Sequence, residues 1–527
     1  MRMKKQIAFH PLLFAMYPIL NLFGQNLGEV AVIDALRPLA ILLVGTGLAL
    51  LLLRGIVKDW AKAGLIVSLS LLWFFSYAHL YRFFKGADLA VFAAIGRHRY
   101  LAPASVLLIL LILVFSLRKL QWPNQVTSFL NVAAIVAIAF PMISIISYNL
   151  QPQGSASTTS QDQVVLTMPE GTAPDIYYII LDSYARDDML RDVFGYDNTP
   201  FLDALEERGF YIARDSWANF GRTSLSLSSS LNMQYLQTLI PDLNPDSEQK
   251  EPLWDLIQQS SVRHSLEAAG YITVAFSTGY PGTELKDADV YITGGMMDQL
   301  LGMNAFNSFE GMLIDNSALK LFFDGAIVLP TILPDLQYPF DMHREWILNV
   351  FHSIGNLPET DQPKFVFAHI ISPHSPYVFN RDGSPVERPS TFTFGFTFGG
   401  GEALTGEAYI QAYRDQLHYI NHELLNALDA ILASSPVPPV IIVQADHGPI
   451  PEGSARPYPE QRMAILNAYY LPPGVEAALY PSITPVNSFR VVFNALFDAQ
   501  MELLEDRIFI SEHPKIFDFK EISEQLH

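Results

Sequence analysis

The chain has 527 residues, of which 50% are hydrophobic, and a formal net charge of −20 at pH 7. It is too long for one simple domain and too apolar for an ordinary soluble protein. It contains no cysteine, which excludes a disulfide, a thiolate metal site and a cysteine nucleophile.

The apolar residues are concentrated in the first 150 positions, where five segments are long enough to cross a bilayer. A transmembrane helix needs about 20 mostly apolar residues. The five expected spans are Phe9–Gly24, Leu36–Leu53, Ala63–Leu80, Leu101–Leu117 and Val126–Tyr148. A cleaved signal peptide is the alternative for the first span, but no small-residue cleavage site follows it cleanly. We therefore expect a five-helix transmembrane region over residues 1–148.

The basic residues between these spans predict their orientation. Three basic groups fall on the same side if all five segments cross, and the positive-inside rule makes that side cytoplasmic. The groups are Arg2, Lys4 and Lys5; Arg54, Lys58 and Lys62; and Arg118 and Lys119. The N-terminus is then cytoplasmic, and everything after Tyr148 lies outside the plasma membrane. The basic loop 81–100 opposes the rule, and one interpretation is that it meets anionic lipid headgroups in the interface.

Charge also divides the chain into two parts. Residues 1–150 hold 13 Lys and Arg against 4 Asp and Glu, whereas the remaining residues hold 20 against 49. A strongly acidic part on a basic membrane anchor argues against a nucleic-acid partner. Solubility is the simplest explanation for the acidity. We expect a multi-pass membrane protein with membrane lipids as partners, and the sequence does not indicate an oligomeric state.

The residues after the last span change in pattern. Residues 149–173 are rich in Gln, Ser, Thr, Pro and Gly, which is typical of a flexible linker. Residues 174–527 alternate short apolar runs with helical patterns, which predicts an extracytoplasmic α/β catalytic domain. Runs without polar alternation indicate a mainly parallel central sheet with helices on both faces. The expected strands are Asp175–Leu181, Tyr271–Phe276, Lys364–Ile370 and Val440–Val443, and the expected helices include Thr199–Arg208, Val262–Ala269, Arg344–Ile354 and Ala408–Ala433. We expect Thr391–Gly401 to be a mobile surface loop or lid.

Five side chains that suit metal or acid–base chemistry fall at or just after the ends of expected strands. In sheets of this kind, ligands bind beyond the carboxyl ends of the strands. The five residues are Asp182, His369, His374, Asp446 and His447. Their shared position predicts one site at one rim of the sheet.

The tripeptide Asp446-His447-Gly448 offers two of the expected metal ligands. Neighbours on a regular strand face opposite ways, but Gly448 lets the chain turn so that both side chains reach one ion. Asp182 adds a carboxylate oxygen, although it could instead cap the next helix. With Thr223 or the substrate as the fourth ligand, this set predicts one divalent ion with an open position. Zinc fits best, and manganese or magnesium fits less well because of the imidazole.

Thr223 begins a hydroxyl-rich helical pattern directly after Arg222. A hydroxyl at a helix start is most often only a cap, and Ser224 is a rival nucleophile. The functional interpretation is that the metal activates the Thr223 hydroxyl for attack on phosphorus, while the helix start and Arg222 stabilise the phosphoryl group. Arg222 could equally be a solvated surface residue. His369 and His374 would bind the other ester oxygens or protonate the leaving group.

His418 and His422 are spaced four residues apart on an expected helix and superficially suggest a metal pair. The stretch lacks the Glu of His-Glu-x-x-His, and its helix is amphipathic. We therefore expect surface or packing residues here.

The motifs together resemble the sulfatase-like branch of the alkaline phosphatase superfamily. In chain order they are a strand ending in Asp-Ser, Asn-Phe-x-x-Thr-x-x-Ser, His-x-x-x-Pro-His-x-Pro and Asp-His-Gly. An anchor of five spans with an external catalytic domain is similar to lipoteichoic acid synthase and lipid A phosphoethanolamine transferase. The resemblance covers most of residues 174–500.

This resemblance implies a covalent phospho- or sulfo-enzyme on Thr223, with Ser226 as the Ser that recurs three residues later. It implies that Asp182, Asp446 and His447 bind the metal together with Thr223. It also implies that His374 contacts the substrate, and we expect Arg222 and Ser226 to contact it too.

The chain departs from the family at three places. Arylsulfatases have Cys-x-Pro-Ser-Arg or its Ser version, whereas this chain has Thr-Ser-Leu-Ser from Thr223. They also pair two Asp on the first strand, whereas Ser183 stands at the second position here, which favours one metal ion over two. The headgroup transferases have a further metal-site His after Asp-His-Gly, and none follows here before His513.

These features lead to a ranked set of functions. The first is a membrane-bound, metal-dependent phosphotransferase or phosphodiesterase that acts on phospholipid headgroups or cell-surface glycan substituents through a phosphothreonine intermediate. The second is a sulfuric ester hydrolase on the same scaffold. The third is an inactive membrane-bound binding or assembly protein.

Overall fold

The computed structural model gives the architecture of most of the chain. Its described residues are 7–28, 30–85, 96–119, 123–150, 163–169, 171–247, 249–293, 307–323, 339–386, 406–450, 458–473, 478–511 and 515–526. The expected lid Thr391–Gly401 lies outside these ranges, as do much of the expected linker 149–173 and half of the basic loop 81–100.

The chain divides into two compact units. One contains Met1–Gln151 together with Phe306–Pro339, and the other contains Pro152–Ala305 together with Phe340–His527. The segment Phe306–Pro339 therefore belongs to the N-terminal unit, although it lies within the range expected as the catalytic domain.

The N-terminal unit is helical, and each of the five expected spans overlaps one of its helices. The helices are α1 (His10–Gln25), α2 (Val32–Val57), α3 (Trp60–Lys85), α5 (His98–Lys119), α6 (Pro123–Asn149), α14 (Ser308–Asp315) and α15 (Lys320–Phe323). Within the described residues, α2, α3 and α6 are long and apolar enough to cross a membrane, and the shorter apolar helix His98–Val114 accompanies them. Helix α1 is shorter and carries Pro18 in its interior.

Helix α14 packs inside the N-terminal unit through both apolar and charged contacts. Phe309 is fully buried and meets Phe23 of α1 edge to face, with ring centroids 6.5 Å apart. The guanidinium of Arg37 on α2 forms an ion pair with Glu310, with 2.6 Å between Nε and Oε1. These contacts explain why a segment from the middle of the chain belongs to this unit.

The second unit is built around a seven-stranded mixed sheet in the order β2-β7-β6-β1-β5-β3-β4. Strands β6, β1, β5, β3 and β4 run parallel, and β2 and β7 add an antiparallel edge. The bounds are β1 (Ile176–Leu181), β2 (Tyr211–Ile212), β3 (Ile272–Phe276), β4 (Val290–Ile292), β5 (Lys364–Ile370), β6 (Val440–Gln444) and β7 (Asn467–Tyr470), and a separate two-stranded sheet pairs β8 (Phe509–Ile510) with β9 (Lys520–Glu521). The predicted α/β domain with a mainly parallel sheet is confirmed.

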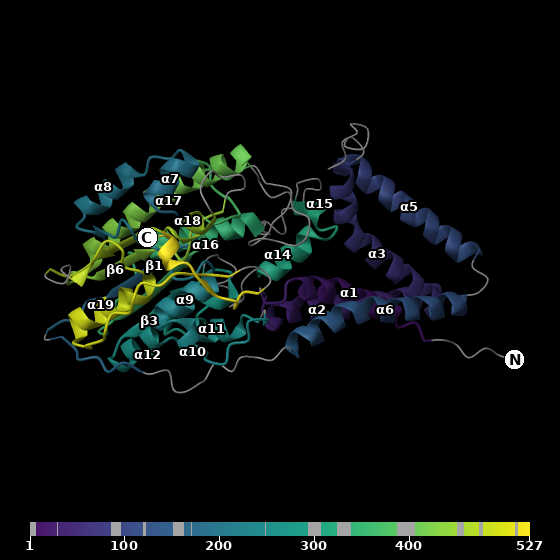
Figure 1. Cartoon of the computed structure of the whole chain (residues 1–527). Helices are drawn as coiled ribbons and strands as arrows, with labels where there is room; N and C mark the ends of the chain where they lie inside the picture. The colour runs from purple at the N-terminus through teal and green to yellow at the C-terminus, as the bar shows by residue number, and fades with distance from the viewer. Residues whose placement is uncertain are drawn as a thin grey trace. The chain divides into compact units, whose positions relative to one another are not determined.

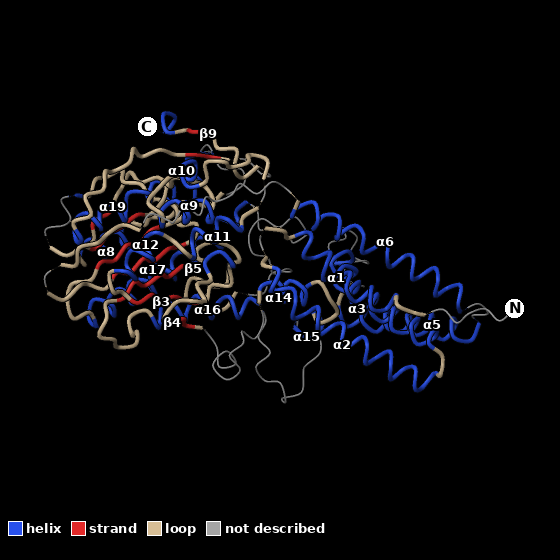
Figure 2. Tube along the Cα trace, turned by 90° about the horizontal axis from the view of Figure 1, so that it is seen from below, coloured by secondary structure: helices blue, strands red, loops and turns tan. Residues whose placement is uncertain are grey.

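Helices cover both faces of this sheet (Figures 1 and 2). One side carries α7, α8 and α17, and the other carries α9, α11, α12 and α19 (Figure 1). The bounds are α7 (Asp187–Phe194), α8 (Thr199–Glu207), α9 (Thr223–Leu231), α10 (Leu236–Leu239), α11 (Glu251–Gln258), α12 (Ser261–Ala268), η1 (Pro281–Thr283), α16 (Pro339–Ser353), α17 (Gly406–Ser434), α18 (Tyr458–Met463), α19 (Pro485–Phe497) and α20 (Ser523–Leu526).

The two-residue alternation of the strands assigns their side chains to these two layers. Ile176, Tyr178 and Ile180 of β1 join the core cluster that includes Leu227 of α9 and Phe489 of α19. Both faces of β1 are buried, which is why the strand reads as a continuous apolar run. The alternation also determines which side chains reach the rim above α9.

Candidate active site

The register of the central strands brings three functional side chains to one place. Ile180 of β1 lies opposite His369 of β5 on one side and Gln444 of β6 on the other. Two residues further along, Asp182 and Asp446 continue the face of the sheet that packs against α9. Strand pairing thus accounts for the meeting of residues that are up to 264 positions apart in sequence.

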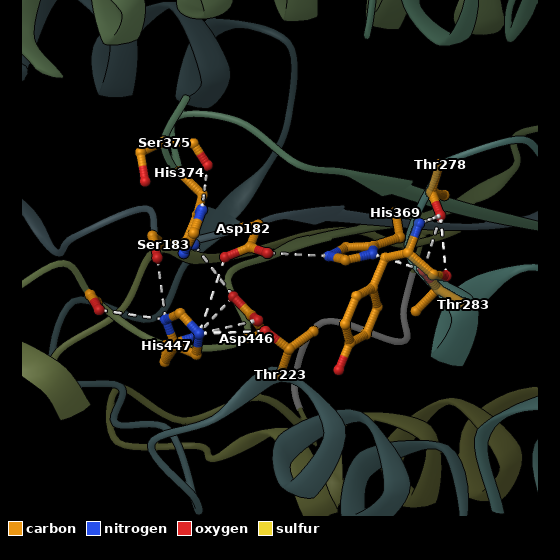
Figure 3. Close-up of polar contacts among 12 residues, drawn as sticks. Asp182, Ser183, Thr223, Thr278, Thr283, His369, His374, Ser375, Asp446 and His447 are labelled. Atoms are coloured by element: carbon orange, nitrogen blue, oxygen red, sulfur yellow. Dashed lines mark hydrogen bonds and ion pairs between the residues drawn. The ribbon is translucent and has the colours of Figure 1, made fainter. Parts of the chain in front are cut away.

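The side chains of Asp182, His369 and Asp446 form a buried cluster that suits a divalent metal ion (Figure 3). One ligand atom from each residue lies within 4.8 Å of the other two. Asp182 Oδ1, His369 Nε2 and Asp446 Oδ2 are all buried and have no hydrogen-bond partner among the described residues. Buried polar atoms are almost always paired, so three converging unpaired ligand atoms indicate a cation site.

The two carboxylates perturb each other because they are buried together. Burial and the charge of Asp182 raise the pKa of Asp446 from its ordinary 3.8 to about 6. Burial also acts to raise the pKa of Asp182, but the neighbouring His374, His369 and His447 side chains outweigh it and hold that pKa below its usual value. A divalent cation between the carboxylates would offset both the repulsion and the lost hydration.

His447 lies at the edge of this cluster in an orientation that suits a metal ligand. Its Nε2 is 3.4 Å from Asp446 Oδ2 and 3.8 Å from Asp182 Oδ1. Its Nδ1 is 3.2 Å from the carbonyl oxygen of Gly448 and 3.1 Å from Ser183 Oγ. A carbonyl can only accept, so Nδ1 carries the proton and Nε2 keeps its lone pair. The expected turn is present here, because Gly448 N–H donates to the Arg462 carbonyl at 2.7 Å.

Thr223 is the first residue of α9, and its hydroxyl faces the cluster (Figure 3). Its Oγ1 is 3.2 Å from His447 Nε2. Thr223 is half-buried, whereas Ser224 and Ser226 are buried to 2% and 1% exposure. A nucleophile must be reached by its substrate, so the exposure favours Thr223 over Ser224. Arg222 occupies the N-cap position beside it.

His369 and His374, for which the sequence predicted the same roles, have different surroundings in the structure. His369 Nε2 is 3.5 Å from Asp182 Oδ2, among the carboxylates rather than beyond them. The backbone N–H of His374 donates to the Asp182 carbonyl at 3.0 Å, and the His374 ring centroid is 6.4 Å from that of His447. His374 Nδ1 is 2.5 Å from the Ser375 carbonyl oxygen, so its Nε2 remains available. His369 therefore suits the metal and His374 suits the substrate.

Two other interpretations of the sequence can be compared with the geometry. The helix after β1 begins at Asp187 with Arg186 at its N-cap, so Asp182 does not cap it. His422 is exposed, and His418 is half-buried with its Nδ1 3.4 Å from the Tyr196 hydroxyl. These two histidines are surface and packing residues as expected.

Sequence reasoning missed Arg462 and gave His343 no role. Arg462 of α18 donates from Nη1 to the Gly448 carbonyl at 2.8 Å and from Nε to the Gly221 carbonyl at 2.5 Å. It thereby joins the turn that carries His447 to the turn that precedes Thr223. His343 of α16 is buried, and burial followed by the charge of His374 lowers its pKa to about 3. No local motif marks either residue, because both reach the site through tertiary packing.

A family model described as Sulfatase matches residues 174–489. The matched range contains Asp182, Thr223, His369 and the Asp446-His447 pair, and it ends within α19. No curated protein matches the sequence.

Three solved structures illustrate which folds the chain is similar to. The C-terminal periplasmic domain of EcEptC from Escherichia coli in complex with Zn is 13% identical with a TM-score of 0.41, over 68% of this chain and 96% of that one. The integral membrane protein lipooligosaccharide phosphoethanolamine transferase A (EptA) from Neisseria meningitidis is 12% identical with a TM-score of 0.36, over 94% and 96%. The lipoteichoic acid synthase LtaP from Listeria monocytogenes is 15% identical with a TM-score of 0.35, over 61% and 72%.

Proposed function

The chain belongs to the sulfatase family, and we propose that it is a membrane-bound, metal-dependent phosphotransferase or phosphodiesterase with Thr223 as its nucleophile. The observation that carries this proposal is the convergence of three unpaired buried ligand atoms beside the Thr223 hydroxyl. An inactive binding protein has no need for two buried carboxylates that repel each other without a cation.

The metal would be held by Asp182, Asp446 and His447, with His369 and the Thr223 hydroxyl completing the set. Two carboxylates with imidazole nitrogens suit zinc best, and manganese or magnesium less well. When bound, the ion would lower the pKa of the Thr223 hydroxyl and withdraw charge from the phosphoryl oxygens.

The protein's own residues would carry the remaining steps. Thr223 Oγ would lose its proton to solvent, attack phosphorus and displace one alcohol of a phosphodiester, which leaves the phosphoryl group on Thr223 still esterified to the other alcohol. His374 is placed to protonate the departing oxygen through Nε2, because its Nδ1 is engaged by the Ser375 carbonyl. The backbone N–H groups at the start of α9, together with Arg222, would contact the phosphoryl oxygens, whereas Ser226, which the sequence predicted as a further contact, is as buried as Ser224. Water or an acceptor hydroxyl then releases the group.

The substrate class follows from the predicted membrane topology. In the part of the chain that the structure describes, three helices are long and apolar enough to cross a membrane, and we propose that all five expected spans do so with a cytoplasmic N-terminus. The catalytic unit would then lie outside the plasma membrane, where phospholipid headgroups and cell-surface glycan substituents are its accessible esters.

Hydrolysis of a sulfate ester is the second candidate, because the matching family model is that of sulfatases. The full chain in detergent, stripped with EDTA and reloaded with Zn²⁺ or Mn²⁺, should be assayed on bis(4-nitrophenyl) phosphate and 4-nitrophenyl sulfate. We expect metal-dependent turnover of the phosphodiester that Thr223→Ala abolishes and Ser224→Ala retains. Turnover of the sulfate ester alone would replace the first candidate with the second, and metal binding without either turnover would favour the inactive protein.

A further inference from the structure

The ring of His369 is held at its second nitrogen by a chain of hydroxyl groups that the proposed mechanism does not use. His369 Nδ1 lies 2.9 Å from Thr283 Oγ1, and Thr283 Oγ1 lies 3.0 Å from Thr278 Oγ1 (Figure 3). The Thr278 hydroxyl lies 3.3 Å from Glu284 Oε1. His369, Thr278 and Thr283 are all at least 96% buried, so water does not compete for these contacts.

Glu284 determines the direction of this chain of hydrogen bonds. Its Oε1 accepts the backbone N–H groups of Thr278 and Gly279 at 2.8 and 2.6 Å, and its Oε2 accepts the Tyr291 hydroxyl. Every group around the carboxylate is a donor, so the carboxylate acts only as an acceptor. Glu284 Oε1 is therefore an acceptor for the Thr278 hydroxyl proton.

The Tyr280 carbonyl oxygen lies 3.4 Å from both threonine hydroxyls and is a further acceptor in this turn. With its proton on Glu284, Thr278 Oγ1 accepts the Tyr280 N–H at 3.1 Å and the Thr283 hydroxyl. Whether the Thr283 hydroxyl donates to Thr278 Oγ1 or to the Tyr280 carbonyl, its oxygen is left to accept from His369 Nδ1–H. His369 Nε2 is left with a lone pair on the side of Asp182 and Asp446, with Asp182 Oδ2 at 3.5 Å. The opposite direction would place a proton on Nε2 and remove it as a ligand.

We propose that Thr283, Thr278 and Glu284 form a tautomer-setting relay that makes His369 Nε2 a metal ligand. Thr283 is the positioning residue that touches the imidazole, and Glu284 anchors the relay through the 277–284 turn. The inference rests on the proposed metal dependence and adds a ligand and its support. His447 is held in the same tautomer by a backbone carbonyl instead, so both imidazoles present Nε2 to the ion.

The relay can be tested by Zn²⁺ affinity on the EDTA-stripped full chain in detergent, measured against a competing chelator without substrate. Thr283→Val removes the hydroxyl at nearly constant volume, and we expect a 10- to 100-fold loss of Zn²⁺ affinity. Thr283→Ser keeps the hydroxyl and should stay within about threefold of the wild type. Thr273→Val is the matched control. This buried threonine of β3 donates a hydrogen bond of 2.7 Å to Glu267, which is not part of the metal cluster. The Zn²⁺ affinity of Thr273→Val should be unchanged.

A double-mutant cycle separates the relay from a general loss of structure. In a His369→Gln background, Thr283→Val should cause no further loss of Zn²⁺ affinity, because the ligand that it supports is gone. Nitrogen NMR of ¹⁵N-histidine in the metal-free protein should find the His369 proton on Nδ1. A proton on Nε2, an unchanged affinity in Thr283→Val, or an undiminished effect in the His369→Gln background would each overturn the relay.

The outcomes also separate the relay from the proposed activity. If the wild type and Thr283→Val bind Zn²⁺ equally tightly, the relay is refuted and the phosphotransferase proposal still stands. Loss of affinity in Thr283→Val without any phosphodiester turnover by the wild type would support the relay and refute the activity. A wild type that binds neither Zn²⁺ nor Mn²⁺ would overturn both.

Discussion

The substitution Asp446→Asn should make the metal-free protein more stable while it removes metal binding. Asp446 Oδ1 accepts the backbone N–H groups of Ser183 and His447 at 3.1 and 2.9 Å, and an asparagine carbonyl can accept both. The new amide nitrogen would replace Oδ2, which lies near the unpaired atoms of Asp182 and His369. The variant thus relieves a buried charge repulsion and gives unpaired acceptors a donor.

The size and pH range of this effect follow from the raised pKa of Asp446. A rise from 3.8 to about 6 at about 1.4 kcal/mol per pH unit corresponds to about 3 kcal/mol against the ionised form in the folded protein. When the pKa of a group is higher in the folded than in the unfolded protein, the folded protein loses stability as the pH rises from the unfolded-state pKa to the folded-state pKa. The gain from Asn should therefore be absent below pH 3.8, grow between pH 3.8 and 6, and be complete above pH 6.

Thermal unfolding of the EDTA-stripped chain in detergent at pH 8 measures this prediction. We expect the Tm of Asp446→Asn to exceed that of the wild type by a few degrees. Zn²⁺ at about 100 times its Kd should stabilise the wild type by about 2.7 kcal/mol and leave the variant unchanged. Asp187→Asn, in the first turn of α7, is the control and should change stability by only a few tenths of a kcal/mol. A metal-free Asp446→Asn protein that melts below the wild type would refute the reasoning.

Three further predictions address the turn, the proposed acid and the helical unit. Gly448→Ala would place a Cβ 2.1 Å from the Gln461 carbonyl oxygen, so we expect about 1–3 kcal/mol of destabilisation and at least a tenfold loss of Zn²⁺ affinity. Unchanged affinity would contradict the claim that this turn positions the metal ligands. His374→Gln should reduce phosphodiester turnover about 100-fold with Zn²⁺ affinity within threefold, whereas an equal loss of both would make His374 a metal ligand. Asn131→Leu removes hydrogen bonds to the backbone of Ile7 and His10 at 3.0 Å each and should destabilise the helical unit by about 1–2 kcal/mol, with Zn²⁺ affinity unchanged; a loss of affinity would contradict a purely structural role.

The positions of the candidate ligands at the strand ends were predictable because their signals are local. An apolar run that ends in a carboxylate marks the exit of a buried strand, and parallel strands all end at the same rim. This reasoning was sufficient to place Asp182, Asp446 and His447 together at one rim of the sheet, and the helical pattern was sufficient to place Thr223 at the start of α9. The Gly448 turn was also expected, and the carbonyl of Gln461 explains why only glycine fits there.

The remaining features depend on contacts that no local pattern records. The register between β1 and β5 decides that His369 faces the carboxylates, and a single sequence does not show a register. The relay through Thr283 requires the turn after β3 to fold beside β5. Helix α14 has only eight residues, and its place in the N-terminal unit depends on partners about 270 positions earlier, such as Arg37 for Glu310.

The most direct test of the central claim is the intact mass of the Zn²⁺-loaded full chain after incubation with a phospholipid extract. The proposed mechanism predicts a phosphoryl-headgroup adduct on the wild type and on Ser224→Ala, and none on Thr223→Ala. An adduct that persists in Thr223→Ala, or its absence from a metal-loaded wild type that turns over phosphodiesters, would contradict a covalent intermediate on Thr223.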